Sequence, residues 1–163
     1  MDAGGGDDLA RIEGHLIALV RRATDPRGNP RINRLAGTDV ERASAVMLAR
    51  VAELEPARLS ALAAAAGVEV STASRQIGRL LELGYVTREP DPGDRRAWAH
   101  RLTPAGRDLR GRLARARRSW LAAVLDGFDP DERARFAELL GRFVAAMADE
   151  EAPDPAGDDP GRA

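Results

Sequence analysis

Apolar residues recur every three or four positions along most of this 163-residue chain, the spacing typical of amphipathic helices. In the N-terminal third, the pattern predicts one helix over residues 8–23 and a second over residues 39–54. Asp39 is expected to cap the second helix, because its carboxylate can accept from a free backbone N–H group. An Asp-, Pro- and Gly-rich stretch at 25–30 ends the first helix, and residues 31–38 are expected to form a connection with at most a turn of helix.

Two shorter helical patterns follow, separated by only a few residues. The first has Leu59 and Leu62 on its apolar face and ends at Gly67, where glycine permits a positive φ. The second is expected over residues 72–83, with Ser71 as its N-cap and Gly84 closing it. Two short helices joined by a glycine-containing turn of about 3–4 residues form a helix-turn-helix.

The period then changes from helical to alternating. Residues 85–88 and 98–102 are predicted to be strands, because apolar and polar side chains alternate in the second and β-formers fill the first. Between them, residues 91–94 spell Asp-Pro-Gly-Asp, a strong turn sequence. Residues 58–103 are therefore predicted to be a winged helix-turn-helix.

Two longer helices are expected after this module, over residues 104–125 and 130–148. Thr103 suits the N-cap of the first, and Pro104 suits its first helical position. Asp129 and Glu132 form a capping-box pair at the start of the second. The fold class is therefore mainly α with a small β-hairpin wing, flanked by helices at both ends.

The predicted organisation has five parts. The terminal segments are rich in Gly, Asp and Pro and are expected to be disordered. From the N-terminus, the parts are a disordered segment (1–7), supporting helices (8–57), the winged helix-turn-helix (58–103), C-terminal helices (104–148) and a disordered acidic tail (149–163).

Positive charge is concentrated on the predicted winged helix. The whole chain has a net charge of −1, but residues 58–118 carry 13 arginines against 6 acidic residues. A merely solvated surface does not predict this clustering, whereas nucleic-acid binding does. The absence of lysine is most simply a bias towards arginine codons.

Several classes of function receive no support. The chain has no cysteine and only two histidines, so neither a disulfide, a cysteine nucleophile nor a transition-metal site is expected. No phosphate-binding glycine loop or Ser/His/Asp motif is present, so we expect no enzyme and no cofactor. No apolar run approaches the ~20 residues that span a bilayer, and the N-terminus is not that of a signal peptide. A soluble, cytoplasmic protein with no membrane contact is expected.

The motifs around the turn and the wing resemble those of the MarR family (multiple antibiotic resistance regulators). The resemblance covers nearly the whole chain and rests on Val-Ser-Thr-Ala-Ser-Arg at 70–75, Gly-Tyr-Val at 84–86, Asp-Pro-Gly-Asp-Arg-Arg at 91–96 and Leu-Thr-Pro-Ala-Gly at 102–106. It implies a dimeric winged-helix regulator that binds double-stranded DNA, often a repressor released by a small ligand. Packing within one protomer explains the broad apolar faces of the terminal helices only in part. The resemblance also implies that these helices interlock with a second copy of the chain.

The candidate DNA contacts lie on the second helix of the turn and at the wing tip. On the helix, Arg75 best suits a guanine edge and Gln76 an adenine edge, whereas Arg79 suits a phosphate. The resemblance points to Arg95 or Arg96 for the minor groove, and we favour Arg96; Asp94 is expected to orient an arginine, and Asp91 to shape the turn. The full set is Ser71, Thr72, Ser74, Arg75, Gln76, Arg79, Arg95 and Arg96.

For an effector, the resemblance implies a site between the dimerisation helices and the winged helix, suited to an aromatic or phenolic molecule. Plain core packing explains Met47 and Trp120 better, since apolar residues at helical spacing usually form the core. The candidate lining residues are His15, Met47, Arg50 and Trp120.

Two alternatives remain open at this point. The chain could be a ligand-independent DNA-binding activator or architectural factor, which would use the same DNA-binding surface. It could also use its winged helix for protein–protein assembly, against which the Arg-rich, acid-poor helix face argues.

Overall fold

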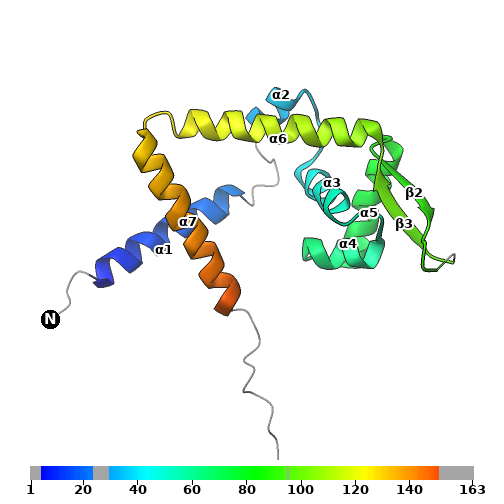
Figure 1. Cartoon of the computed structure of the whole chain (residues 1–163), viewed down its shortest axis with the longest axis horizontal. Coiled ribbons are helices and arrows are strands. Elements are labelled where there is room, and N and C mark those ends of the chain that lie inside the picture. Colours follow the sequence, from blue (N-terminus) through cyan, green and yellow to red (C-terminus); the bar gives the residue numbers. More distant parts are fainter. Residues whose placement is uncertain (1–4, 24–29, 95, 151–163) are drawn as a thin grey trace, which may run out of the picture. The chain divides into compact units, whose positions relative to one another are not determined.

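The computed structural model describes residues 5–23, 30–94 and 96–150, which form seven helices and three strands (Figure 1). Residues up to Trp120 form one compact unit, and residues from Leu121 onward form a second. The elements are α1 (Gly5–Ala23), α2 (Pro30–Ala36), α3 (Arg42–Leu54), β1 (Ala57–Arg58), α4 (Leu59–Ala66), α5 (Val70–Glu82), β2 (Val86–Pro90), β3 (Trp98–Leu102), α6 (Pro104–Val124) and α7 (Pro130–Glu150).

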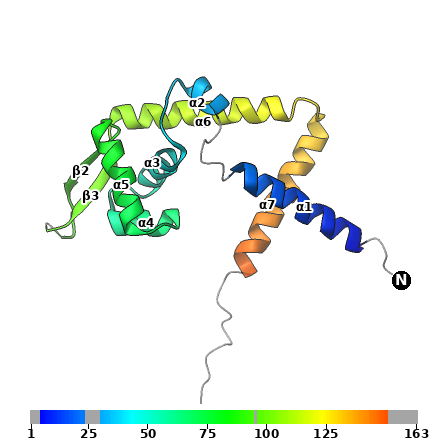
Figure 2. The same cartoon turned by 180° about the vertical axis from the view of Figure 1, so that it is seen from behind.

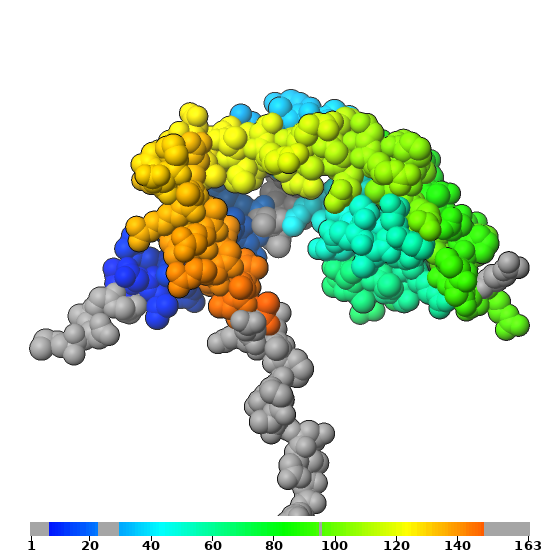
Figure 3. Space-filling view, in the orientation of Figure 1, coloured from blue at the N-terminus to red at the C-terminus, as the bar shows by residue number. Residues whose placement is uncertain are grey.

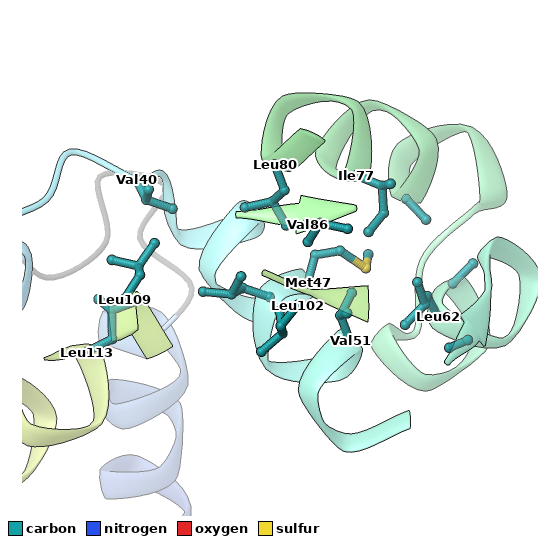
Figure 4. Close-up of a cluster of buried hydrophobic side chains, with 14 of the residues drawn as sticks. Val40, Met47, Val51, Leu62, Ile77, Leu80, Val86, Leu102, Leu109 and Leu113 are labelled. Atoms are coloured by element: carbon teal, nitrogen blue, oxygen red, sulfur yellow. The ribbon is translucent and has the colours of Figure 1, made fainter. Parts of the chain in front are cut away.

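The core joins α3, α4 and α5 to one face of the sheet and to the first half of α6 (Figure 4). Met47, Leu48, Leu62, Leu80 and Leu109 are at most 2% exposed. Truncating any one of these side chains to alanine is expected to cost about 2–5 kcal/mol. Figure 3 shows α3, α4, α5 and the wing as one continuous mass. The helix-turn-helix and the wing thus share one apolar core with α3 and the first half of α6.

The wing is a three-stranded antiparallel sheet in the order β1-β3-β2, rather than the two-stranded hairpin that the sequence predicts. In the β2–β3 pair, Val86 lies opposite Leu102 and Arg88 opposite His100. The extra strand β1 has only two residues, of which Ala57 pairs with His100. Two residues are too few to produce an alternating pattern in the sequence.

Glycines end the helices of the turn, as predicted. Gly67 and Gly84 have φ of 62° and 71°, a conformation that costs glycine little. The two predicted N-caps before α3 and α5 are wrong. Asp39 lies outside α3, whose N-cap is Glu41, and Ser71 lies inside the first turn of α5, whose N-cap is Glu69. Neither glutamate makes a side-chain capping bond, so both helices depend on packing.

The start of α6 is capped as predicted. The Thr103 hydroxyl accepts from Gly106 N–H at 3.0 Å and donates to the Gly84 carbonyl at 2.7 Å. Thr103 N–H also donates to the Tyr85 carbonyl at 3.1 Å. The first turn of α6 is therefore fixed to the end of the helix-turn-helix.

The predicted capping box at the start of α7 is also present. Asp129 Oδ1 accepts from Glu132 N–H at 2.8 Å, and Glu132 Oε2 accepts from Asp129 N–H at 2.9 Å. α7 continues to Glu150, beyond the predicted end at 148, and residues 151–163 of the predicted disordered tail lie outside the described part. At the other end, α1 begins at Gly5, inside the segment expected to be disordered, whose residues 1–4 are not described.

The connection at 31–38 is more ordered than expected, because α2 occupies most of it. Arg112 of α6 donates to the Gly37 carbonyl at 3.0 Å and also to that of Ala36, which satisfies carbonyls at the end of α2. Asn33 Nδ2 donates to the Val40 carbonyl at 3.1 Å. The bonds from Arg112 attach the segment before α3 to α6, and the bond from Asn33 closes the segment on itself.

Both outer helices expose their apolar side chains. In α1, Leu9, Ile12 and Leu19 are 49–70% exposed. In α7, Phe136, Leu139, Leu140, Phe143, Val144 and Met147 are 38–58% exposed. Across the described residues, no helix combines the length and the apolar character needed to cross a membrane.

Candidate nucleic-acid interface

α5 presents a polar face that is free of carboxylates until its last turn. Ala73, Ile77 and Leu80 bury the opposite face, which fixes how the helix is rotated. Among the predicted contact residues, Thr72 and Gln76 are half-buried, and Ser71, Ser74, Arg75 and Arg79 are exposed. The outward face is thus suited to bases and phosphates, which need hydrogen-bond donors.

The two cations on this face differ in their surroundings. Arg79 Nη1 pairs with Glu82 Oε2 at 3.3 Å, one turn further along the helix. Arg75 has no ion-pair partner among the residues that the structure describes. Arg75 is therefore the cation on α5 that is available for a base edge.

Gln76 makes a hydrogen bond within the protein that the sequence does not predict. Its Oε1 accepts a hydrogen bond of 2.7 Å from the hydroxyl of Ser44, which is buried on α3. A bidentate contact to adenine uses the same oxygen as an acceptor, so Gln76 would have to share this oxygen between the base and Ser44 through its two lone pairs. Ser44 was not predicted from the sequence, since nothing in a sequence links two positions 32 residues apart.

The wing tip is fixed to the start of the helix-turn-helix by an arginine–aspartate pair. Arg58 Nη2 and Nε donate to the two carboxylate oxygens of Asp91 at 2.8 and 3.1 Å. The same carboxylate accepts from the backbone N–H groups of Gly93 and Asp94. The pair raises the pKa of Arg58, and the bond from Arg58 lowers the pKa of Asp91 to about 2. Asp91 therefore shapes the turn, as expected, and also anchors it.

Arg96 and its neighbours form the tip itself. Asp94 Oδ1 accepts from the backbone N–H of Arg96 at 3.1 Å, and Asp94 Oδ2 lies 3.9 Å from Arg58 Nη2. The guanidinium of Arg96 is exposed and has no acidic partner in the described chain. Arg95 lies outside the described residues. The tip thus presents at least one arginine on a braced turn.

An Asp91→Asn variant is expected to be less stable than the parent at neutral pH, with the difference vanishing in acid. Because the folded-state pKa of about 2 lies below the ordinary 3.8, the carboxylate stabilises the fold above pH 3.8. This stabilisation is lost as the pH falls from 3.8 towards about 2. Thermal unfolding of both proteins across this range measures the difference. Asp94→Asn is the matched control, and a gap for Asp91→Asn that persists at the acidic end would contradict the assignment.

His100 is a buried residue of β3, the central strand of the sheet. It is 6% exposed, and its Nδ1 lies 3.2 Å from the Ala57 carbonyl. Burial lowers the pKa of His100, and the nearby charge of Arg88 lowers it further. The ring is therefore neutral at pH 7 and links β3 to β1.

A groove of about 540 Å³ lies between the helices α4 and α5 and the β2–β3 hairpin. Its described lining includes Arg58, Arg88 and Trp98 but no carboxylate. The Arg88 guanidinium stacks over the Trp98 ring, 5.0 Å from its centroid. Residues of both α5 and the wing thus line the groove.

Comparison with known proteins gives the same picture as this geometry. A model of the MarR family matches residues 40–98. The uncharacterized HTH-type transcriptional regulator YxaD of Bacillus subtilis is 30% identical over 139 residues, which cover 85% of this chain and 94% of that protein. The chain belongs to the MarR family.

Solved structures show the same MarR fold. A MarR family transcription regulator superposes with a TM-score of 0.72 at 22% identity, covering 93% of this chain and 99% of that one. Wild-type apo MarR from E. coli gives a TM-score of 0.66 at 23% identity, covering 80% and 95%. This MarR-family chain is thus a winged helix-turn-helix transcription regulator, a class of DNA-binding protein and not of enzyme.

The four effector candidates in this MarR-family chain have dissimilar surroundings. Met47 is 2% exposed in the core, as the packing interpretation expects. Arg50 pairs with Glu53 on α3, and its Nε is buried without a hydrogen-bond partner in the described part of the chain. Trp120 is half-buried near the end of α6, and His15 is exposed on α1. None of the four lines the groove beside α5.

Proposed function

We propose that this MarR-family regulator is a homodimeric repressor that binds a pseudo-palindromic operator and is released by a small aromatic or phenolic effector. The observation that carries the proposal is the polar face of α5, which has no carboxylate before Glu82 and on which Arg75 has no ion-pair partner among the described residues. In this proposal α5 enters the major groove, and Arg96 at the wing tip enters the adjacent minor groove.

The exposed apolar faces support the dimer. Six large side chains along α7 are at least 38% exposed in a single chain, and α1 adds several more. Contiguous apolar surface of this kind marks a protein–protein contact. A second copy is the simplest partner, since a twofold dimer presents two α5 helices to half-sites about 10 bp apart.

In this proposal, an effector releases the DNA by changing the spacing of the two α5 helices. Both half-sites are engaged only when the two α5 helices have the spacing of the operator. A ligand that binds preferentially to a dimer with another spacing lowers the affinity for DNA. Equal operator affinity with and without every candidate effector would count against this part and favour a ligand-independent regulator.

The test of DNA binding uses the promoter DNA that flanks the protein's own gene. Binding is measured over a range of salt concentrations with random-sequence duplex as competitor. We expect tight binding that survives the competitor, with log K falling steeply as log salt rises. Binding no tighter than to random DNA would oppose this promoter as the target, and no binding at low salt would overturn the proposed function.

For the dimer, we expect Phe143→Glu to raise the dissociation constant of self-association by at least about 100-fold. A carboxylate in an apolar interface is left without a partner, which costs several kcal/mol. Ala145→Glu is the matched control, because it adds the same charge to the opposite face of α7. Light scattering gives the mass of each protein, and a dimer mass unchanged in Phe143→Glu would contradict this assignment.

A further inference from the structure

The charged side chains that line the groove beside α5 are all positive. Its polar side chains are two arginines, two serines, His100 and the indole N–H group of Trp98, and none of its described lining residues is acidic. His100 is neutral at pH 7, so the net charge of the lining is positive. Such a surface attracts an anion, which can be a phosphate.

Arg88 differs from the other arginines of the sheet. Arg58 is paired with Asp91, and Arg101 on β3 is paired with Glu89. Arg88 has no carboxylate partner among the described residues and is held only by the face of Trp98. The indole ring positions the guanidinium without neutralising it.

The register of the sheet places Arg88 on the face that packs against the helices. Arg88 lies opposite His100, and side chains two positions apart share a face, so Arg88, His100 and Trp98 all lie on the face that borders the groove. Arg101 and Glu89 alternate with them and lie on the opposite face. The unpaired cation and the ring that holds it are thus on the side of α5.

The location of the groove identifies its occupant. Figures 1 and 2 show α5 beside the β2–β3 hairpin, and residues of both elements line the groove. In DNA, a sugar–phosphate strand separates the major groove from the adjacent minor groove. When α5 lies in one groove and the wing tip in the other, that strand has to pass between them.

We infer that this groove seats a sugar–phosphate strand of the DNA, with Arg88 as a phosphate contact and Trp98 as the residue that positions Arg88. The inference rests on the proposed function, because it requires α5 and the wing to straddle one strand.

The floor of the groove fits this occupant. Gly78 lies in the middle of α5, and a Cβ added there would meet nothing within 4 Å. Glycine inside a helix is unfavourable, and an open position lets another backbone approach closely. Ser60 and Ser74 line the same groove, and their hydroxyls are able to donate to phosphate oxygens.

The test compares Arg88→Gln with Arg101→Gln, which removes the same charge from the opposite face of the sheet. Each protein is titrated with own-promoter DNA and with random-sequence duplex at several salt concentrations. We expect Arg88→Gln to bind both DNAs about tenfold more weakly and to lower the salt slope by about 1, with discrimination between them unchanged. Arg101→Gln should keep the slope of the parent.

Two results would overturn the inference. If the parent binds own-promoter DNA but Arg88→Gln keeps its slope, the groove does not hold a phosphate and the proposed function stands. If the parent binds no DNA, both fail. Unfolding curves that coincide for the parent and both variants exclude a loss caused by misfolding.

The role of Trp98 is tested by rescue and by a double mutant. Trp98→Ala should reproduce most of the loss of Arg88→Gln, and Trp98→Phe should restore it, because phenylalanine keeps an aromatic face for the guanidinium. In the Arg88→Gln background, Trp98→Ala should have no further effect on affinity or slope. An equal loss in both backgrounds would overturn the positioning role.

Discussion

A Gly106→Ala variant is expected to lose about 3 kcal/mol or more of folding stability. A Cβ at position 106 would lie 2.0 Å from the carbonyl oxygen of Tyr85 and 2.9 Å from its carbonyl carbon. Both atoms belong to backbone, which cannot rotate away as a side chain does. The same carbonyl accepts from Thr103 N–H, so moving it also disturbs the start of α6. Overpacking that shifts backbone is among the few mechanisms with effects this large.

Gly111→Ala in the same helix is the matched control. Its added Cβ would meet only the end of the flexible Arg115 side chain, at 3.4 Å. We expect a gain of about 0.5–1 kcal/mol there, because alanine favours the helix over glycine. Urea unfolding measures both variants. Equal effects at the two positions would show that the close approach to Tyr85 does not exist.

Arg75→Ala is expected to weaken operator binding by about 1–3 kcal/mol, roughly 5- to 150-fold, if its guanidinium makes a bidentate contact with guanine. The exposed position of Arg75 on α5 and the absence of a described carboxylate partner leave both of its terminal nitrogens available. The lost binding energy should concern one base pair. The variant should therefore lose its preference for guanine at that position and keep its base preferences at the other positions.

Arg79→Ala provides the contrast. Arg79 is already paired with Glu82 and is expected to contact phosphate, so its loss should weaken binding to all sequences alike and lower the salt slope by about 1. Binding of each variant to a set of operators with single base changes separates the two patterns. An unchanged sequence preference in Arg75→Ala would show that Arg75 does not contact a base.

Local chemistry made much of the fold predictable from the sequence. Gly67 and Gly84 end helices because their backbone conformation favours glycine, and Asp129 and Glu132 cap each other within one turn. Both kinds of signal are contained in a few consecutive residues. The exact boundaries of β3, Trp98–Leu102, were likewise predicted from alternation alone.

Contacts between distant positions were not predictable in the same way. The bond from Ser44 to Gln76 and the pair of Arg58 with Asp91 join residues 32 and 33 positions apart. Each depends on how α3, α5 and the wing pack, which periodicity does not specify. The N-cap predictions at Asp39 and Ser71 were wrong for a related reason, since tertiary packing moved both helix starts away from the best local caps.

The pair of Arg58 with Asp91 also bears on how an operator can vary. Because it joins the beginning of the helix-turn-helix to the turn of the wing, this pair restrains the distance between Arg75, the proposed base contact, and Arg96, the proposed minor-groove contact. Each half-site then has to match the distance between these two proposed contacts. A base pair inserted within a half-site would move the DNA away from one of them. In the proposed dimer, the distance between half-sites is set by contacts between the two copies instead. Natural operators of this regulator should therefore differ more in the spacer than inside either arm.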